Sequence, residues 1–136
     1  MNGHGTHCAG TIASRTYGVA KAANVIAVKV LDSEGFGDVM DIAAGVRWAA
    51  ADAKKKAVAD LKATGKTKHK GSVANMSLTC IKSDLVDTAV NDAIDGGLHF
   101  AVAAGNDKRY AQPCLIHVVF LTIGWKGMQV SILLQV

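Results

Sequence analysis

The chain has 136 residues, half of them apolar, with 19% charged residues and a mean hydropathy of +0.23. This composition suits one folded domain and excludes a disordered chain, and 14 glycines without sustained heptads exclude a coiled coil. The net charge of +4 is local, because seven lysines and one aspartate lie between Lys54 and Lys70. No arginine or aromatic residue accompanies them, so we interpret the run as a solvated helix face and loop and expect no nucleic-acid partner. A basic nucleic-acid-binding patch is the weaker alternative.

The sequence shows no pattern typical of a signal peptide or of a membrane span. Three cysteines are too few for a disulfide scaffold, and Met1 is not followed by the charged and apolar regions of a signal peptide. The most apolar stretch, 114–123, is shorter than the roughly 20 residues that span a bilayer as a helix. We therefore expect no membrane partner.

Apolar runs and helical periodicity alternate along the chain. A loop leading into a short helix is predicted over 2–14. Runs rich in β-branched and apolar residues predict three buried strands, at 24–31, 72–78 and 98–103. Helices are predicted between them, one from a cap at Asp38 or Asp41 to about residue 63, and one over 84–95. This order predicts an α/β fold, an incomplete doubly wound parallel sheet flanked by helices.

The second of these helices has a clear apolar face. Ser83 is its expected cap, and Gly96 and Gly97 its expected end. Its inward positions are predicted to be Leu85, Val86, Ala89, Val90, Ala93 and Ile94.

The amino-acid composition changes after residue 112. We divide the chain into residues 1–112 and an apolar tail, 113–136, whose origin is unclear. One or two additional strands are the simpler interpretation of the tail, and a segment foreign to the rest of the chain is the sharper one.

The opening motif, NGHGTHCAGT over residues 2–11, is the most specific signal in the sequence. Glycines flank His4 and leave its imidazole uncovered, and a neutral imidazole can move a proton between a hydroxyl nucleophile and a leaving group. The motif closely resembles the histidine motif of the subtilisin-like serine proteases, peptidase family S8, in the proteinase K and cerevisin branch.

The resemblance continues in order over about residues 2–112. It is carried by four further segments, at 17–31, 35–37, 71–78 and 99–107. It implies a subtilisin-like fold and a serine-type endopeptidase that acts on extended polypeptide substrates through a Ser-His-Asp triad. It also implies a secreted or vacuolar location.

Site residues follow from the resemblance, position by position. It implies His4 as the general base and Asn106 as the side-chain donor of the oxyanion hole. It also implies a set of substrate-binding positions: Gly37, Ser77, Leu78, Ala103, Ala104 and Gly105.

Simpler interpretations stand beside these roles. Asn106 also suits a turn, Ser77 a buried strand hydroxyl, and Cys8 a small core residue. His4 and His7 together suggest a metal pair, but no third ligand stands at a recognisable spacing, and we assign no cofactor. Calcium is implied by the family alone, without an assignable oxygen cage in this chain.

The family pattern breaks at three places. No acidic residue precedes His4, and Asp32 and Asp38 are interpreted as turn and cap residues. None of the serines stands in a Gly-Thr-Ser-x-Ala context, and Thr79-Cys80 replace the glycines expected after Leu78. We therefore expect a fragment with a marginal fold that is inactive by itself, because a base without a nucleophile forms no acyl-enzyme. The alternative is a non-catalytic remnant that binds peptides or protease partners.

Overall fold

The computed structural model describes residues 2–65, 71–103, 106 and 129–135, the last segment by its backbone only. The elements in chain order are α1 (His4–Ala13), β1 (Asn24–Leu31), α2 (Val39–Thr64), β2 (Ser72–Met76), α3 (Asp84–Asp95), β3 (Leu98–Val102) and β4 (Gln129–Gln135). Helices and a small parallel sheet therefore make up the described part, as expected for the α/β class.

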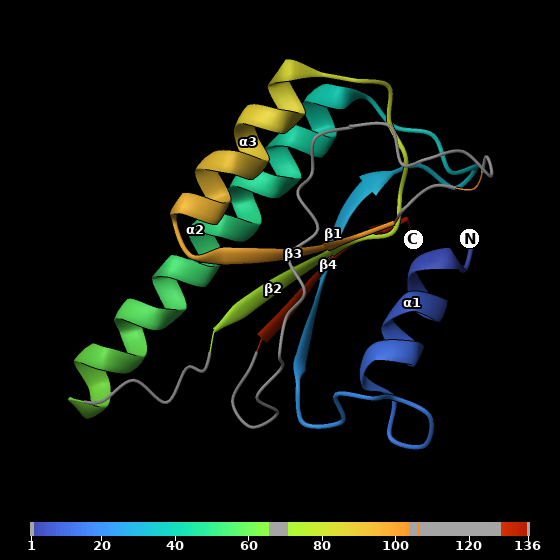
Figure 1. Cartoon of the computed structure of the whole chain (residues 1–136). Helices are drawn as coiled ribbons and strands as arrows, with labels where there is room; N and C mark the ends of the chain where they lie inside the picture. Colours follow the sequence, from blue (N-terminus) through green and yellow to red (C-terminus); the bar gives the residue numbers. More distant parts are fainter. Residues whose placement is uncertain (1, 66–70, 104–105, 107–128, 136) are drawn as a thin grey trace.

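The sheet has the strand order β1-β4-β2-β3, and every neighbouring pair is parallel. β4 separates β1 from β2, so that Gln129 is in register with both Asn24 and Ser72. Helices α2 and α3 lie side by side against one face of the sheet, and α1 lies on the other side (Figure 1). Within the described residues, β1 and β3 form the two edges.

The core lies between the sheet and the pair α2 and α3. Its largest fully buried side chains come from all these elements: Phe100, Met76, Leu98, Val46, Val86 and Val90. The inward positions expected on α3 pack here as predicted, four of them fully buried, with Leu85 and Ile94 partly buried against the same cluster. Burial of these apolar side chains supplies the main driving force for folding.

The ends of the elements differ from the sequence prediction in informative ways. β2 ends at Met76 rather than Leu78, and β3 ends at Val102 rather than Ala103, because Met76 and Val102 form the last register pair. Asp38, not Asp41, caps α2, since its Oδ1 accepts the N–H of Met40 at 2.7 Å. Ser83 stands at the cap of α3 but makes no side-chain hydrogen bond there.

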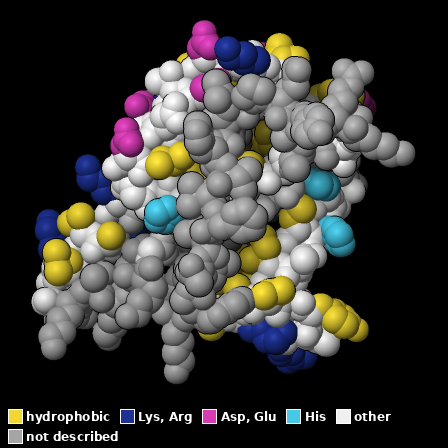
Figure 2. Space-filling model, viewed as in Figure 1, with side chains coloured by type: hydrophobic (Ala, Val, Ile, Leu, Met, Phe, Trp, Pro, Cys, Tyr) yellow, Lys and Arg dark blue, Asp and Glu magenta, His cyan; other side chains and the backbone are white. Residues whose placement is uncertain are grey.

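Charged and apolar side chains are spread over the visible surface. Figure 2 shows the Lys and Arg side chains of this face in separate places rather than as one patch. Within the part of the chain that the structure describes, no helix is both long and apolar enough to cross a membrane. Of the tail, the structure describes only the strand β4, and residues 113–128 lie outside the described set.

Candidate functional site

His4 is the first residue of α1, placed there by the turn before it. Gly3 has a φ of 86°, a left-handed conformation that strains other residues, and the helix begins directly after it. The imidazole is exposed, and its Nε2–H donates to the carbonyl oxygen of Ser77 at 2.8 Å. A carbonyl oxygen only accepts, so this contact requires the proton on Nε2. The Sγ of Cys8, one turn later, lies 3.7 Å from the same nitrogen.

A cleft of about 790 Å³ lies beside His4 where the chain leaves the carboxyl ends of β1, β2 and β3. Ligand sites in parallel sheets are found at this edge. Of the residues expected at the site, the cleft is lined by His4, Gly37, Ser77, Leu78, Ala103 and Asn106. The other two expected residues, Ala104 and Gly105, lie outside the described residues.

One wall of the cleft is formed by the segment that leaves β2. Ser77 and Leu78 directly follow β2, are half-buried, and line the cleft. Asn75 Nδ2 donates to the Ser77 hydroxyl at 3.0 Å, and the N–H of Ala103 donates to the carbonyl of Met76 at 3.2 Å. The first bond lies within the wall segment itself, and the second ties the end of β2 to the residue that follows β3.

The opposite wall is the loop between β1 and α2. A side chain on Gly37 would place its Cβ 2.3 Å from the carbonyl oxygen of Val30, so only glycine fits this close approach. Asp32 shapes the same loop, because its Oδ1 accepts the N–H groups of Phe36, Glu34 and Gly35, each at 2.9 Å. The backbone hydrogen bonds from Phe36 and then Glu34 lower the pKa of Asp32 below its ordinary value of 3.8. Asp32 is thus a turn residue, as its sequence position suggested.

Several residues of the cleft were not among the predicted site residues. Phe36 from one wall and Ile81 from the other are 72% and 81% exposed, and both line the cleft. Phe36 stands within the Gly35–Gly37 segment that carried the resemblance, whereas no sequence signal marked Ile81. Thr79 and Cys80 also line the cleft, so the departure from the family's glycines lies in the wall itself.

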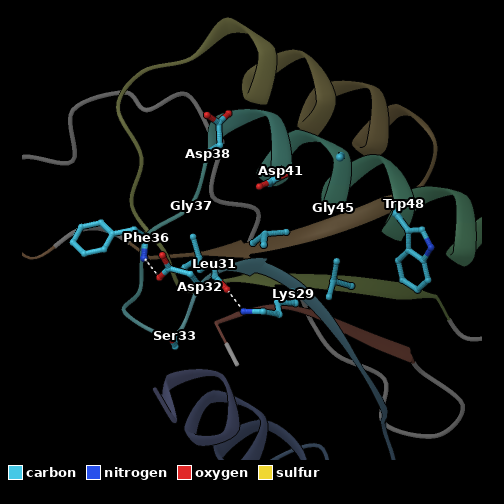
Figure 3. Close-up of a pocket in the computed structure, with 13 residues that line it drawn as sticks. Lys29, Leu31, Asp32, Ser33, Phe36, Gly37, Asp38, Asp41, Gly45 and Trp48 are labelled. Carbon is cyan, nitrogen blue, oxygen red and sulfur yellow. Dashed lines mark hydrogen bonds between the residues drawn. The ribbon is translucent and has the colours of Figure 1, made fainter. Parts of the chain in front are cut away.

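Metal chemistry finds no support in the described part of the chain. No group of three or more His, Cys, Asp or Glu residues there could hold a metal ion. Cys8 packs instead with three apolar neighbours on or near α1: Ala9, Ile12 and Ala23. A larger groove adjoins this cleft and shares Leu31, Phe36, Gly37 and Asp38 with it (Figure 3). His4 and Asn106 line only the smaller cleft, which is therefore the candidate site.

His4 and Asn106 therefore line one cleft at the carboxyl ends of parallel strands. Residues 1–126 match the model of the subtilase family, peptidase S8. The chain therefore belongs to the subtilase family.

Three fungal proteins illustrate the similarity. The chain is 63% identical over 109 residues to the subtilisin-like serine protease Pen c 2 of Penicillium citrinum, covering 79% of this chain and 23% of that protein. It is 62% identical over 108 residues to alkaline protease 2 of Aspergillus fumigatus, and 57% identical over 107 residues to subtilisin-like protease 8 of Trichophyton verrucosum. Each match covers 79% of this chain, but only 21% and 22% of those two relatives. The chain thus spans about a fifth of the length of these relatives. No solved structure matches it.

Proposed function

We propose that this chain carries two parts of a subtilisin-like serine endopeptidase site, the general base and the side-chain donor of the oxyanion hole. The substrates of this site are extended polypeptide segments. The supporting observation is that His4, Asn106, Gly37 and Ser77, which are far apart in sequence, line one cleft. Membership of the subtilase family supplies the reaction class.

Each group has a definite task in this chemistry. His4 accepts the proton of a serine hydroxyl as that oxygen attacks the peptide carbonyl, and then returns it to the leaving amine. The side-chain amide of Asn106 donates a hydrogen bond to the oxyanion of the tetrahedral intermediate. The backbone at Gly37 on one wall and at Ser77 and Leu78 on the other pairs with an extended substrate as added strands.

Substrate binding and activation of the base are coupled through Ser77. Its carbonyl oxygen accepts the Nε2–H of His4, and Ser77 is one of the residues that line the cleft in which the substrate strand would lie. A substrate N–H that takes this acceptor displaces His4, and once the imidazole proton has moved from Nε2 to Nδ1, Nε2 can receive a proton from the nucleophile. The resting contact therefore holds the base until the cleft is filled.

Hydrolysis needs a serine nucleophile and an aspartate of the triad, and neither stands in the family's motif within these 136 residues. The chain has six serines, and none stands in a Gly-Thr-Ser-x-Ala string. We therefore propose that cleavage requires a nucleophile and an aspartate from outside the matched segment. For the complete protease we propose a secreted or vacuolar location, following the resemblance.

A chimera tests the proposed roles. The 109-residue segment matched in Pen c 2 is replaced by the corresponding residues of this chain, and hydrolysis of a fluorogenic peptide is measured. We expect activity that falls by about 10⁶-fold with His4→Ala and by about 10² to 10³-fold with Asn106→Ala, magnitudes that subtilisin itself provides. His7→Ala, which alters an exposed histidine on the same helix, is the matched control and should retain activity.

Two results would contradict these roles. One is a chimera whose activity survives His4→Ala. The other is a folded chimera that stays inactive even after Thr79→Gly and Cys80→Gly restore the family's glycines.

A second candidate function is peptide binding without cleavage. It is favoured by Thr79 and Cys80, because their side chains line a wall where glycines would let a substrate backbone approach closely. If this candidate is correct, the chimera retains peptide without cutting it, and the two glycine substitutions do not raise the rate.

A further inference from the structure

The floor of the candidate cleft is apolar and continuous with the core. Leu31, Val39 and Leu78 are partly buried and pack against the core cluster, and Ile42 is one of its buried members. All four residues line the cleft, and we call them the cleft floor. A peptide side chain that points into the cleft therefore meets apolar surface beneath it.

Two further apolar side chains line the same cleft but stand in solvent. Phe36 is 72% exposed and Ile81 is 81% exposed. Phe36 comes from the loop between β1 and α2, and Ile81 from the segment between β2 and α3, so they belong to opposite walls. Side chains with this much exposure project from the walls and do not pack on the cleft floor. We call this pair the cleft rim.

The backbone beneath Phe36 is held by hydrogen bonds. Its N–H donates to Oδ1 of Asp32 at 2.9 Å, and its carbonyl oxygen accepts the N–H of Asp32 at 2.7 Å. Figure 3 shows the Phe36 ring pointing away from Trp48 and from the rest of the larger groove. An aromatic side chain on a fixed turn loses little conformational entropy when it binds a ligand. Phe36 therefore suits the role of a preorganised anchor.

The opposite wall changes from buried to exposed between two neighbouring residues. Cys80 is partly buried against the core cluster, whereas Ile81, the next residue, is exposed. A single exposed apolar side chain needs no explanation. Two of them on opposite walls of one cleft, however, place apolar surface on both sides of the path that a bound peptide takes.

An extended peptide presents side chains to both the floor and the rim, because its successive side chains point to opposite faces. One side chain meets the cleft floor, and the next points outward, where water would otherwise surround it. We propose that Phe36 and Ile81 bind this outward side chain and thereby select peptides with two adjacent apolar residues. This selection rests on the proposed function only in that the peptide lies in this cleft. It concerns specificity and not the chemical step.

Two labelled peptides of equal composition test the selection. Both are blocked threonine peptides of about six residues that carry two leucines, adjacent in one peptide and separated by one threonine in the other. Adjacent leucines reach the floor and the rim together, whereas separated leucines point to the same face. In fluorescence anisotropy titrations with the full chain, the adjacent-leucine peptide should bind about fivefold tighter or more.

Matched variants locate the difference on the chain. Phe36→Ser and Ile81→Ser should each reduce it to about twofold or less, because either change removes one side of the apolar contact. Both side chains are exposed, so neither substitution removes core packing. Val58→Ser, at an apolar residue that is 44% exposed and does not line the cleft, is the control and should preserve the difference.

The chimera with Pen c 2 provides a second measurement, because its folding does not depend on these 136 residues alone. The leucines are placed at each successive pair of positions before a fluorogenic leaving group, and kcat/KM is measured. Adjacent leucines should be preferred at one pair of positions, and the two serine substitutions should remove this preference. A preference that persists while cleavage survives His4→Ala would refute the catalytic roles alone. An active chimera without the preference would refute the selection alone.

Three outcomes overturn the inference. The first is no tighter binding of the adjacent-leucine peptide by the full chain, together with equal kcat/KM values for the two arrangements in the chimera. The second is a difference that survives both Phe36→Ser and Ile81→Ser. The third is a difference that Val39→Ala removes and the two serine substitutions do not, which would place both leucines on the cleft floor.

Discussion

Asp32 organises the turn after β1 through three backbone N–H groups. These hydrogen bonds favour the ionised carboxylate, so its pKa in the folded chain lies below the ordinary 3.8. The resulting stabilisation is complete above about pH 3.8 and is lost as the pH falls through the lowered folded value. In urea titrations from about pH 5 downward, the parent should lose more stability than Asp32→Asn, which keeps an acceptor oxygen but no charge. Parallel pH curves for the two proteins would contradict this role of Asp32.

Gly37 is a second residue whose identity the local geometry requires. A Cβ there would meet the Val30 carbonyl oxygen at 2.3 Å and the Leu31 side chain at 2.6 Å. We expect Gly37→Ala to lower the free energy of unfolding by about 1–3 kcal/mol, because backbone must move to relieve the overlap. Gly10→Ala is the control, since nothing lies within 4 Å of a Cβ at that helical position and alanine should stabilise α1 by about 0.5–1 kcal/mol. Equal effects of the two substitutions in urea unfolding would refute the close-approach argument.

At the scale of elements, helices α2 and α3 begin differently. The Asp38 side chain accepts a backbone N–H at the start of α2, whereas the Ser83 side chain makes no such bond at the start of α3. Asp38→Ala should therefore cost about 1 kcal/mol of stability, and Ser83→Ala less than about 0.5 kcal/mol. Thermal unfolding of both variants measures the difference, and a larger loss for Ser83→Ala would show that α3 is capped after all.

Local patterns were sufficient to predict most elements but not their arrangement. The β-branched run at 24–31 and the apolar periodicity of 84–95 each gave an element with the bounds that the structure has, β1 and α3. The insertion of β4 between β1 and β2 was not predicted. The order of strands in a parallel sheet depends on long-range packing, and the apolar tail lacks the alternation that would fix its pairing.

The candidate site shows the same division between motif and geometry. His4 and Asn106 were predicted from motifs, and the structure brings both to one cleft. Ile81 was missed, because an exposed isoleucine in a loop carries no periodic or motif signal. The hydrogen bond from His4 to Ser77 joins residues 73 positions apart, a contact that only the folded chain reveals.

At the scale of the whole molecule, the sheet leaves strand edges at β1 and β3 in the described part of the chain. One core holds it together, with Phe100 among its largest buried side chains. We expect a stability near the lower end of the usual range of about 5–15 kcal/mol. Phe100→Ala, which costs about 3–5 kcal/mol, should then populate the unfolded state in mild urea. A parent chain that unfolds cooperatively with a free energy of unfolding far above this range would contradict the expectation of a marginal fold.

The most direct test of the account is incubation of the purified 136-residue chain with a fluorogenic extended peptide. The cleft contains the expected base and oxyanion donor, but the sequence lacks a serine in the family's context, so no cleavage above background is predicted. Cleavage that is lost with His4→Ala would contradict this prediction and would show that the chain contains its own nucleophile.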